Sequence, residues 1–330
     1  MKAAVTTEDH GFTIVDMSDP TPGPDELVIR VAACGVCGSD IKAQPFMPAG
    51  LVMGHELGGD IVAVGSDAGD WATGTNVAVL PVVSCGSCRY CAHGAVSHCG
   101  QTRYIGMGPD GGGFAELAVV PARHAFALPD DVTKSHAALV EPFTVGLHGV
   151  HRAEIRQGED VLVAGAGGVG LTTVAWAHAV GAGRVTAVDP DPKRRELARS
   201  MGATDVAASV TEVDASCYDA ALECVGRPEL LQACQAALRP CGRVVISGAC
   251  AEPTPIEPVT ALLKELTIRY SVCYTPDEFR QVVTAFSTGA IDPTAMIGPT
   301  LGLNQIAEAF DLVRDAAVHG RVLVTTQERA

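Results

Sequence analysis

A glycine-rich turn between an apolar strand and a helical segment constrains the fold of this chain more than any other feature. Residues 161–164 (VLVA) form a buried-strand pattern, the stretch GAGGVG follows, and residues 171–180 form a helical run. In such a unit the first glycine permits a tight turn, the second lets a pyrophosphate approach the backbone, and the third lets helix and strand pack closely. The helix N-terminus adds free N–H groups for the phosphates. The pattern predicts a dinucleotide site at Gly165, Gly167, Gly168, Val169 and Gly170. The alternative is a glycine-rich turn that binds no ligand.

A carboxylate stands where the ribose of such a dinucleotide would lie. Asp189 ends the next predicted strand, 19 residues after Gly170. There it can accept hydrogen bonds from the adenosine ribose hydroxyls, and its charge would repel a 2′-phosphate. The sequence therefore favours NAD over NADP, although Arg194 and Arg195 lie close by and weaken the exclusion of NADP a little.

Strands and helices alternate from about residue 144 to residue 271. Further strands are predicted at 184–188, 219–223 and 243–247, and helices at 192–201 and 229–238. This alternation indicates βαβ units and a parallel sheet, hence an α/β fold. Before residue 144, short strands such as 26–33 and 59–64 are separated by turns and suggest a β-barrel-like unit. The final part has helical stretches near 277–287 and 305–314 and a strand at 321–325.

Length and charge exclude several classes of protein. A chain of 330 residues most often makes two domains. A formal net charge of −15 argues against nucleic-acid or anionic-membrane partners, because phosphates would be repelled. No apolar run approaches the length of a bilayer span, and we expect no signal peptide because the start, MKAAVTTEDH, has no apolar segment. Twelve cysteines without such a signal indicate reduced thiols and a cytoplasmic location.

Four of these cysteines lie close enough in sequence to share one metal ion. Cys85, Cys88, Cys91 and Cys99 have the spacing C-x2-C-x2-C-x7-C. Four thiolates can surround a tetrahedral zinc and leave no position for a substrate, so we predict a structural zinc. Closely spaced disulfides and a chance cluster of buried thiols are the alternatives.

A second metal site is predicted from residues of mixed type. Cys37 follows one predicted strand, His55 and Glu56 precede another, and Glu141 lies in the apolar stretch LVEPF. A buried carboxylate needs a partner, and a cation shared with Cys37 and His55 would provide one. Such a set leaves room for water or substrate, as catalytic zinc sites do. The alternative for the Cys–His pair is ordinary packing and hydrogen bonding.

Taken together, these motifs resemble the zinc-dependent alcohol dehydrogenases of the medium-chain dehydrogenase/reductase superfamily. The resemblance runs nearly end to end and follows the order of seven stretches: CGSD at 37–40, GHE at 54–56, the four-cysteine lobe at 85–99, GGGFAE at 111–116, EP at 141–142, GAGGVG at 165–170 and GRVLVTT at 320–326. It implies a GroES-like β-barrel catalytic domain, split in sequence, around a Rossmann domain with a doubly wound parallel sheet. We therefore expect a catalytic domain over 1–143 and 272–330 and an NAD-binding domain over 144–271.

The resemblance also implies roles for individual residues. Cys37, His55 and Glu141 match catalytic zinc ligands, and Glu56 matches a carboxylate that can enter the coordination shell. Asp40 matches the residue that orients the ligating histidine, and Ser39 matches the hydroxyl that takes the substrate proton. Arg194 matches a contact to the adenosine ribose, and Arg321 matches a cation near the pyrophosphate. Which of Glu56 and Glu141 ligates the resting metal stays open.

Two departures bear on the substrate. The EP motif is similar to the polyol, threonine and butanediol dehydrogenase branch, yet Lys42 stands where many relatives have a histidine of the proton relay. The segment 41–53 is short and apolar, which suits either a cleft for a modestly apolar alcohol or simple packing of the loop.

The expected reaction is hydride transfer between NAD(H) and a secondary alcohol or vicinal diol, with two zinc ions per chain. Alternatives on the same scaffold are oxidation of a polyol, sugar or amino alcohol and reduction of a C=C bond. A non-catalytic zinc protein is the alternative of a different class. Because the stretch 242–268 is rich in β-branched and apolar residues, we expect a homodimer or homotetramer.

Overall fold

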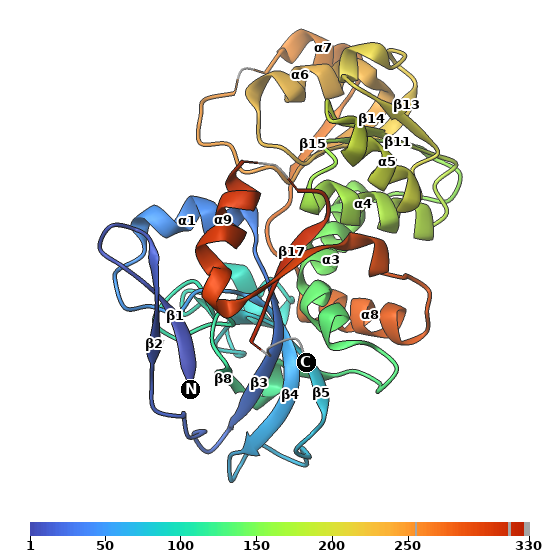
Figure 1. The fold of residues 1–330 in the computed structure, drawn as a ribbon. Coiled ribbons are helices and arrows are strands. Elements are labelled where there is room, and N and C mark those ends of the chain that lie inside the picture. The colour runs from blue at the N-terminus through green and yellow to red at the C-terminus, as the bar shows by residue number, and fades with distance from the viewer. Residues whose placement is uncertain (255, 316–317, 327–330) are drawn as a thin grey trace. The chain divides into compact units, whose positions relative to one another are not determined.

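The computed structural model describes residues 1–254, 256–315 and 318–326 of a chain that divides into two compact units (Figure 1). Unit 1 consists of Met1–Glu141 and Tyr274–Ala330, and unit 2 consists of Pro142–Cys273. The predicted domain boundaries follow residues 143 and 271. The chain passes from one unit to the other after Glu141 and after Cys273, two residues from each predicted boundary. The assignment of catalysis to unit 1 and of NAD binding to unit 2 stays a prediction.

A seven-stranded sheet organises unit 1. Its strands follow the order β16-β17-β3-β4-β5-β9, with β8 paired to β3. Their bounds are β3 (Glu26–Gly35), β4 (Glu56–Val64), β5 (Asn76–Val79), β8 (Leu117–Pro121), β9 (Ala125–Ala127), β16 (Ile297–Gly302) and β17 (Arg321–Thr325). The last strand, β17, pairs antiparallel with β3, which brings the C-terminal segment back into the first unit. This return confirms the prediction of a barrel-like domain that is split in sequence.

Smaller elements complete unit 1. Two hairpins pair β1 (Lys2–Thr6) with β2 (Phe12–Asp16) and β6 (Val82–Val83) with β7 (Arg103–Tyr104). The helices are α1 (Gly38–Ala43), α2 (Arg89–Ala92), α8 (Pro276–Ser287), α9 (Ile306–Arg314) and the first part of α3 (Lys134–Ala153). Phe310 of α9 packs edge to face against Phe12 and Phe114, with ring centroids 4.6 and 5.7 Å apart. These contacts join the C-terminal helix to the core of the first segment.

Unit 2 is a six-stranded parallel sheet with the order β12-β11-β10-β13-β14-β15. The strands are β10 (Asp160–Ala164), β11 (Arg184–Val188), β12 (Asp205–Ala207), β13 (Tyr218–Glu223), β14 (Leu238–Ile246) and β15 (Thr267–Tyr270). The connecting helices include α4 (Gly168–Ala179), α5 (Pro192–Ser200), α6 (Pro228–Ala237) and α7 (Pro258–Leu263). The strand order reverses between β10 and β13, the place where doubly wound sheets bind their ligands. The predicted doubly wound parallel sheet is confirmed.

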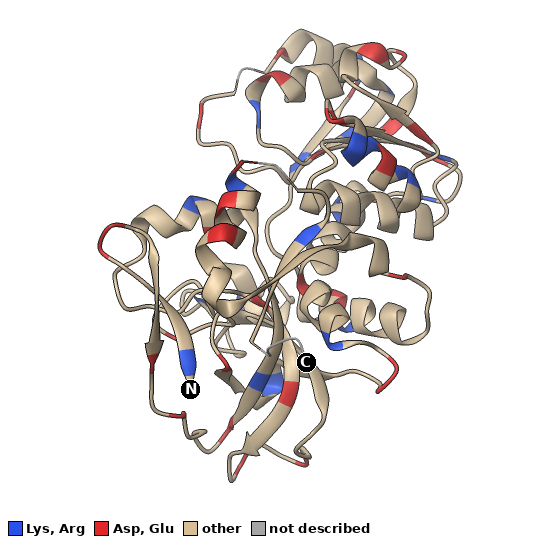
Figure 2. Ribbon diagram, viewed as in Figure 1, with Lys and Arg blue, Asp and Glu red and all other residues tan. Residues whose placement is uncertain are grey.

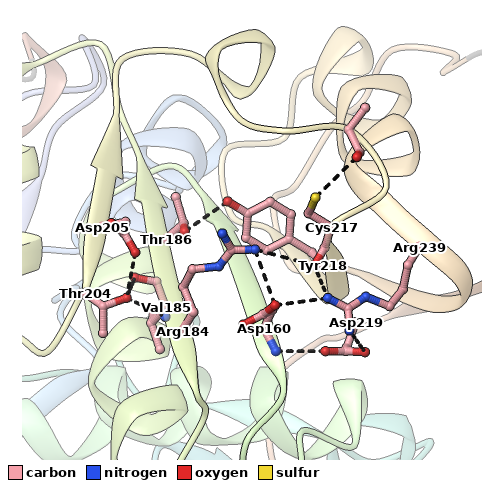
Figure 3. A network of polar contacts seen from close by, with 11 residues as sticks. Asp160, Arg184, Val185, Thr186, Thr204, Asp205, Cys217, Tyr218, Asp219 and Arg239 are labelled. Carbon is pink, nitrogen blue, oxygen red and sulfur yellow. Dashed lines mark hydrogen bonds and ion pairs between the residues drawn. The ribbon is translucent and has the colours of Figure 1, made fainter.

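A polar network ties together the amino ends of these strands (Figure 3). Asp160 accepts hydrogen bonds from Arg184 at 3.3 Å and from Arg239 at 3.0 Å, while Arg239 also reaches Asp219 at 3.0 Å. The Arg184 guanidinium lies over the ring of Tyr218, 4.6 Å from its centroid. The network therefore lies at the amino ends of the strands, whereas the glycine turn follows the carboxyl end of β10.

Charge is spread over the chain rather than gathered in one segment. Figure 2 shows Asp and Glu on loops and helices of both units, interspersed with Lys and Arg. Among the described residues, no helix has the length and apolar character that a bilayer crossing requires.

Candidate metal centres and cofactor turn

The four-cysteine lobe gathers its sulfur atoms around one point. Cys85, Cys88, Cys91 and Cys99 each offer a sulfur, and these atoms all lie within 4.8 Å of one another. The sulfur of Cys91 lies 3.8 Å from that of Cys85 and 3.5 Å from that of Cys88. A tetrahedral zinc with Zn–S bonds of ~2.3 Å would hold its sulfurs about 3.8 Å apart. The four residues therefore fit a zinc ion.

Backbone N–H groups favour the thiolate form of one cysteine in this lobe. The backbone N–H groups of Ser87 and Cys88 lower the pKa of the Cys85 thiol to about 6. A thiolate, rather than a thiol, is the form that ligates metal. All four cysteines are free thiols, as are the other eight of the chain. The lobe is thus a set of four thiol groups that are not locked in disulfides.

The second predicted centre assembles where β3 and β4 meet. Gly35 at the end of β3 pairs with Glu56 at the start of β4, so the residues just beyond these ends come together. Cys37, His55 and Glu56 offer a sulfur, a nitrogen and an oxygen within 4.8 Å of one another. His55 and Glu56 are buried. The antiparallel register therefore explains why residues 18 positions apart form one cluster.

Asp40 contacts two residues of this cluster through its carboxylate oxygens. Its Oδ1 lies 3.0 Å from Nδ1 of His55, and its Oδ2 accepts a hydrogen bond of 2.9 Å from the backbone N–H of Cys37. Burial lowers the pKa of His55, and the Asp40 carboxylate raises it, with the balance well above the ordinary value. The surroundings of His55 thus favour positive charge, which a proton or a metal ion can supply.

Ser39 lies beside the same histidine. Its Oγ is 3.4 Å from Nε2 of His55, the ring nitrogen that does not face Asp40. Lys42, further along α1, is exposed. Ser39 therefore places a hydroxyl group beside one of the predicted metal ligands.

Glu56 is a buried carboxylate with unusual surroundings. Its side chain is fully buried, and Oε2 lies 3.1 Å from Nε of Arg321, itself 7% exposed. Neither carboxylate oxygen has a hydrogen-bond partner of good geometry among the described residues. A buried oxygen without a partner is costly, so a cation at this point is a suitable partner. Arg321 pairs with Oε2, whereas Oε1 has no partner among the described residues, so Glu56 together with Cys37 and His55 fits a zinc ion.

The position of Arg321 was not expected from the sequence. Its guanidinium lies against Glu56 and donates to the backbone carbonyl of Val36 at 3.3 Å. Its predicted contact with a pyrophosphate stays a prediction.

Glu141 lies outside the Cys37–His55–Glu56 cluster but close to its charges. It is located in α3, directly before the crossing into unit 2. Burial raises the pKa of Glu141 to about 7, and the charges of His55 and Glu56 also act on it. The hydroxyl of Tyr274 donates a 2.8 Å hydrogen bond to its Oε1. Tyr274 was not predicted as a site residue, since no local motif marks a partner 133 residues away.

The glycine turn has the form that a pyrophosphate requires. Gly165 has φ +97°, a conformation that side chains disfavour, and a Cβ on Gly170 would lie 1.7 Å from the carbonyl oxygen of Gly165. A Cβ on Gly167 would meet nothing within 4 Å, so the space beside it is open. Gly168, Val169 and Gly170 form the first turn of α4, with Gly167 as its N-cap. The residues therefore fit a dinucleotide phosphate at the helix N-terminus.

Asp189 stands next to this turn at the end of β11. Its Oδ2 accepts a 2.9 Å hydrogen bond from the backbone N–H of Ala166, and its Oδ1 accepts one from Asp191 at 3.0 Å. Arg194 reaches Oδ2 at 3.9 Å, whereas Arg195 donates to the backbone carbonyls of Asp189 and Pro190. The structure thus brings the predicted acidic residue and the glycine turn together.

Comparison with known proteins places both units in one family. The model of the alcohol dehydrogenase GroES-like domain matches residues 23–130, and that of the zinc-binding dehydrogenases matches residues 168–288. Sorbitol dehydrogenase of Bacillus subtilis is 31% identical over 329 residues, which cover 94% of this chain and 93% of that protein.

Two solved structures show the same likeness. A protein of Sinorhizobium meliloti solved with NADP bound has a TM-score of 0.91 and 32% identity, with 98% of each chain covered. A protein of Escherichia coli solved with NADH has a TM-score of 0.91 and 30% identity, with 98% of this chain and 99% of that chain covered.

Proposed function

Because the chain belongs to the zinc-dependent alcohol dehydrogenases of the medium-chain dehydrogenase/reductase superfamily, we propose that it interconverts a secondary alcohol or vicinal diol and its ketone with NAD(H). The family itself makes the protein a zinc-binding oxidoreductase that acts on CH–OH groups with a nicotinamide cofactor. The proposal adds the cofactor preference, the substrate class and the roles of individual residues.

One observation carries the proposal: Cys37, His55 and Glu56 offer a sulfur, a nitrogen and an oxygen within 4.8 Å of one another. These residues, with Glu141 as a further carboxylate, would hold the catalytic zinc, and the four-cysteine lobe would hold a second ion. When bound, the zinc supplies a Lewis acid and the nicotinamide accepts or donates the hydride.

The protein's own groups would orient the reactants and move the proton. Asp40 fixes the ring of His55 through Nδ1, so that Nε2 faces the metal position. Ser39, whose Oγ lies 3.4 Å from that Nε2, would take up or release the hydroxyl proton of the substrate. Since Lys42 is exposed on α1, we propose that the proton continues from Ser39 through the ribose or water.

For the cofactor, the carboxylate of Asp189 supports NAD, because it would repel a 2′-phosphate. Arg194, 3.9 Å from that carboxylate, offsets part of its charge and would contact the ribose. Arg321 remains our candidate for a cation near the pyrophosphate. We also propose a cytoplasmic location, which the twelve free thiols support.

The apolar segment 41–53 bears on the substrate class, because it either lines the substrate cleft or packs against the core. Ile41 and Met47 pack against the core of unit 1 and Met53 is buried within it, which favours the packing interpretation for these residues. Phe46 is 83% exposed. Oxidation of a polyol or sugar is therefore the second candidate, and the likeness to sorbitol dehydrogenase favours it.

The test follows NADH absorbance over time against a panel of alcohols, diols, polyols, amino alcohols, ketones and activated alkenes. We expect the highest kcat/KM with a secondary alcohol or vicinal diol, and zinc analysis should give about two ions per chain. A non-catalytic zinc protein would be favoured by two results together: one zinc per chain that is retained in Cys37→Ala, and no turnover of any substrate.

Two variants separate metal binding from proton transfer. Cys37→Ala should abolish turnover and release the catalytic zinc. Ser39→Ala should keep the zinc and lower kcat by about 10²–10⁴-fold, the usual contribution of an acid–base group. NADH binding should be unchanged in both, since the glycine turn is untouched. Full activity of Cys37→Ala would rule out the proposed zinc mechanism.

A further inference from the structure

A buried hydrogen bond joins two residues at the points where the chain leaves unit 1 and returns to it. Glu141 is the last residue of the first stretch of this unit, and Tyr274 is the first residue of the second. The Tyr274 hydroxyl donates to Oε1 of Glu141 over 2.8 Å. Tyr274 is 3% exposed and Glu141 is 8% exposed. The contact is thus a hydrogen bond that is shielded from water.

The local sequence also holds the tyrosine in place. Thr275 and Glu278 form a capping box that begins α8, with Pro276 in the first turn. Tyr274 precedes the cap, and its ring lies 6.1 Å from that of Phe279, the fourth residue of the helix. This pair is a hydrophobic staple, which sets the direction in which the chain enters a helix. Phe279 is held in turn by Phe126, at 4.9 Å between ring centroids.

The carboxylate that Tyr274 holds lies near the charges of the candidate metal centre. His55 and Glu56 lie within electrostatic reach of Glu141, as the effect of their charges on its pKa shows. Glu141 is also part of a helix, so its backbone position is fixed by α3. The remaining freedom lies in its side-chain torsions, and a hydrogen bond to one oxygen restricts them.

We propose that Tyr274 is a positioning residue of the catalytic metal centre, which sets the direction of the Glu141 carboxylate toward the Cys37–His55–Glu56 cluster. The inference rests on the proposed function, because it assigns Glu141 to that zinc. Partners that hydrogen-bond a metal-facing carboxylate raise metal affinity by fixing its orientation. Tyr274 would therefore act on the metal without touching it.

The test compares Tyr274→Phe with the unmodified protein. This change removes one oxygen and keeps the ring that packs on Phe279. We expect the zinc dissociation constant of the catalytic centre, measured by chelator competition, to rise about 10–100-fold, the usual effect of losing such a partner. The visible spectrum of the protein with Co²⁺ at this centre should change, and kcat should fall while the dissociation constant of NADH stays the same.

A matched control is available in unit 2. Tyr218 is also 3% exposed, and its hydroxyl also donates one buried hydrogen bond, to Thr186 at 3.0 Å. Tyr218→Phe should lose similar thermal stability and leave zinc affinity and the Co²⁺ spectrum unchanged. In the background of Glu141→Gln, adding Tyr274→Phe should weaken zinc binding by less than twofold more, because the two residues act as a unit.

The outcomes separate the two proposals. Unchanged zinc affinity and Co²⁺ spectrum in Tyr274→Phe, or equal losses in both backgrounds, would overturn the role of Tyr274 and leave the zinc mechanism intact. If Cys37→Ala binds zinc at this centre like the unmodified protein, the proposed function itself fails, whatever Tyr274→Phe does.

Discussion

Asp189 combines two tasks in one side chain. Both of its oxygens accept backbone N–H groups, from Ala166 in the glycine turn and from Asp191 at the start of α5. The carboxylate therefore orders the turn in addition to its proposed contact with the ribose. Removing the side chain should disturb both contacts, whereas Asp189→Asn keeps one acceptor oxygen, which can still face the N–H of Ala166, and loses only the second contact.

This difference gives a prediction for cofactor choice. Asp189→Asn should lower the preference for NAD over NADP by at least about tenfold, which corresponds to about 1.4 kcal/mol of differential binding. Asp189→Gly should relax the preference too and should also weaken NAD binding, because Ala166 loses its acceptor. Equilibrium binding of both cofactors to both variants measures these effects. An unmodified protein that prefers NADP would show that Asp189 does not have the assigned role.

His124 gives a prediction for stability against pH. Burial lowers its pKa to about 4, against an ordinary value of 6.5, and Nδ1 lies 3.2 Å from the carbonyl oxygen of Leu80. Between these two values the unfolded chain binds the proton more readily than the folded protein, so stability falls as the pH falls from about 6.5 to 4. From pH 7 to pH 5 this single group should account for about 2 kcal/mol of lost stability.

Urea unfolding at pH 7 and pH 5 tests this effect. His124→Asn keeps a donor for Leu80 and cannot take up a proton, so its stability should fall by about 2 kcal/mol less than that of the unmodified protein over this range. His10→Asn, at an exposed histidine, is the control and should leave the pH dependence unchanged. If both variants lose stability in parallel with the unmodified protein, His124 does not titrate as described.

The sequence reveals site residues that lie near strand ends better than those joined over long distances. Cys37, His55 and Glu56 could be grouped because each borders a predicted strand, and paired antiparallel strands bring such borders together. Tyr274 could not be found in this way, because its contact with Glu141 joins residues 133 positions apart and depends on how the chain packs in unit 1. Arg321 was singled out by likeness to a family, but its contact with Glu56 required the structure.

For the helices and strands, local pattern was sufficient where it was strong. The predicted strands at 184–188 and 321–325 coincide with β11 and β17, because runs of β-branched residues mark them clearly. The long helix α3 was missed, since Pro142 interrupts its pattern and prolines usually end helices. The short strands β12 and β15 were also missed, because they are defined by their neighbours in the sheet rather than by their own residues.

The zinc lobe gives a prediction at the level of one loop. Its regular elements are short: the four-residue helix α2, the three-residue 3-10 helix Val96–His98 and the flanking two-residue strands β6 and β7. Little besides a metal ion would therefore hold its shape. Cys88→Ser should release the structural zinc and unfold the lobe, because metal binding at such sites supplies folding free energy on the order of 10 kcal/mol. Metal analysis and thermal unfolding measure the change.

A cysteine outside the lobe provides the control for this experiment. Cys241 is exposed in unit 2, and Cys241→Ser should keep both the zinc content and the melting temperature. A Cys88→Ser protein that melts like the unmodified one and retains its metal would contradict a structural role for the lobe.

For the entire protein, the exposed apolar surface of unit 2 carries the last prediction. The stretch 242–268, predicted to pair with another copy, ends in β15, and this strand forms one edge of the six-stranded sheet. Nearby, Leu262 and Leu263 of α7 are 75% and 77% exposed. An uncovered strand edge beside apolar side chains favours association between copies. We therefore expect a homodimer, or a tetramer built from dimers, in light scattering at micromolar concentration.

Charge substitution on this surface tests where the copies meet. Leu263→Glu should shift the protein toward monomer, because a carboxylate buried in the interface would lack a partner. Phe46→Glu is the matched control, since Phe46 is also highly exposed but belongs to unit 1, and this variant should keep the assembly. A monomer for the unmodified protein would refute association altogether. If Phe46→Glu dissociates while Leu263→Glu stays assembled, the interface does not lie at α7 and β15. The exposure of Leu262 and Leu263 would then not be explained by association.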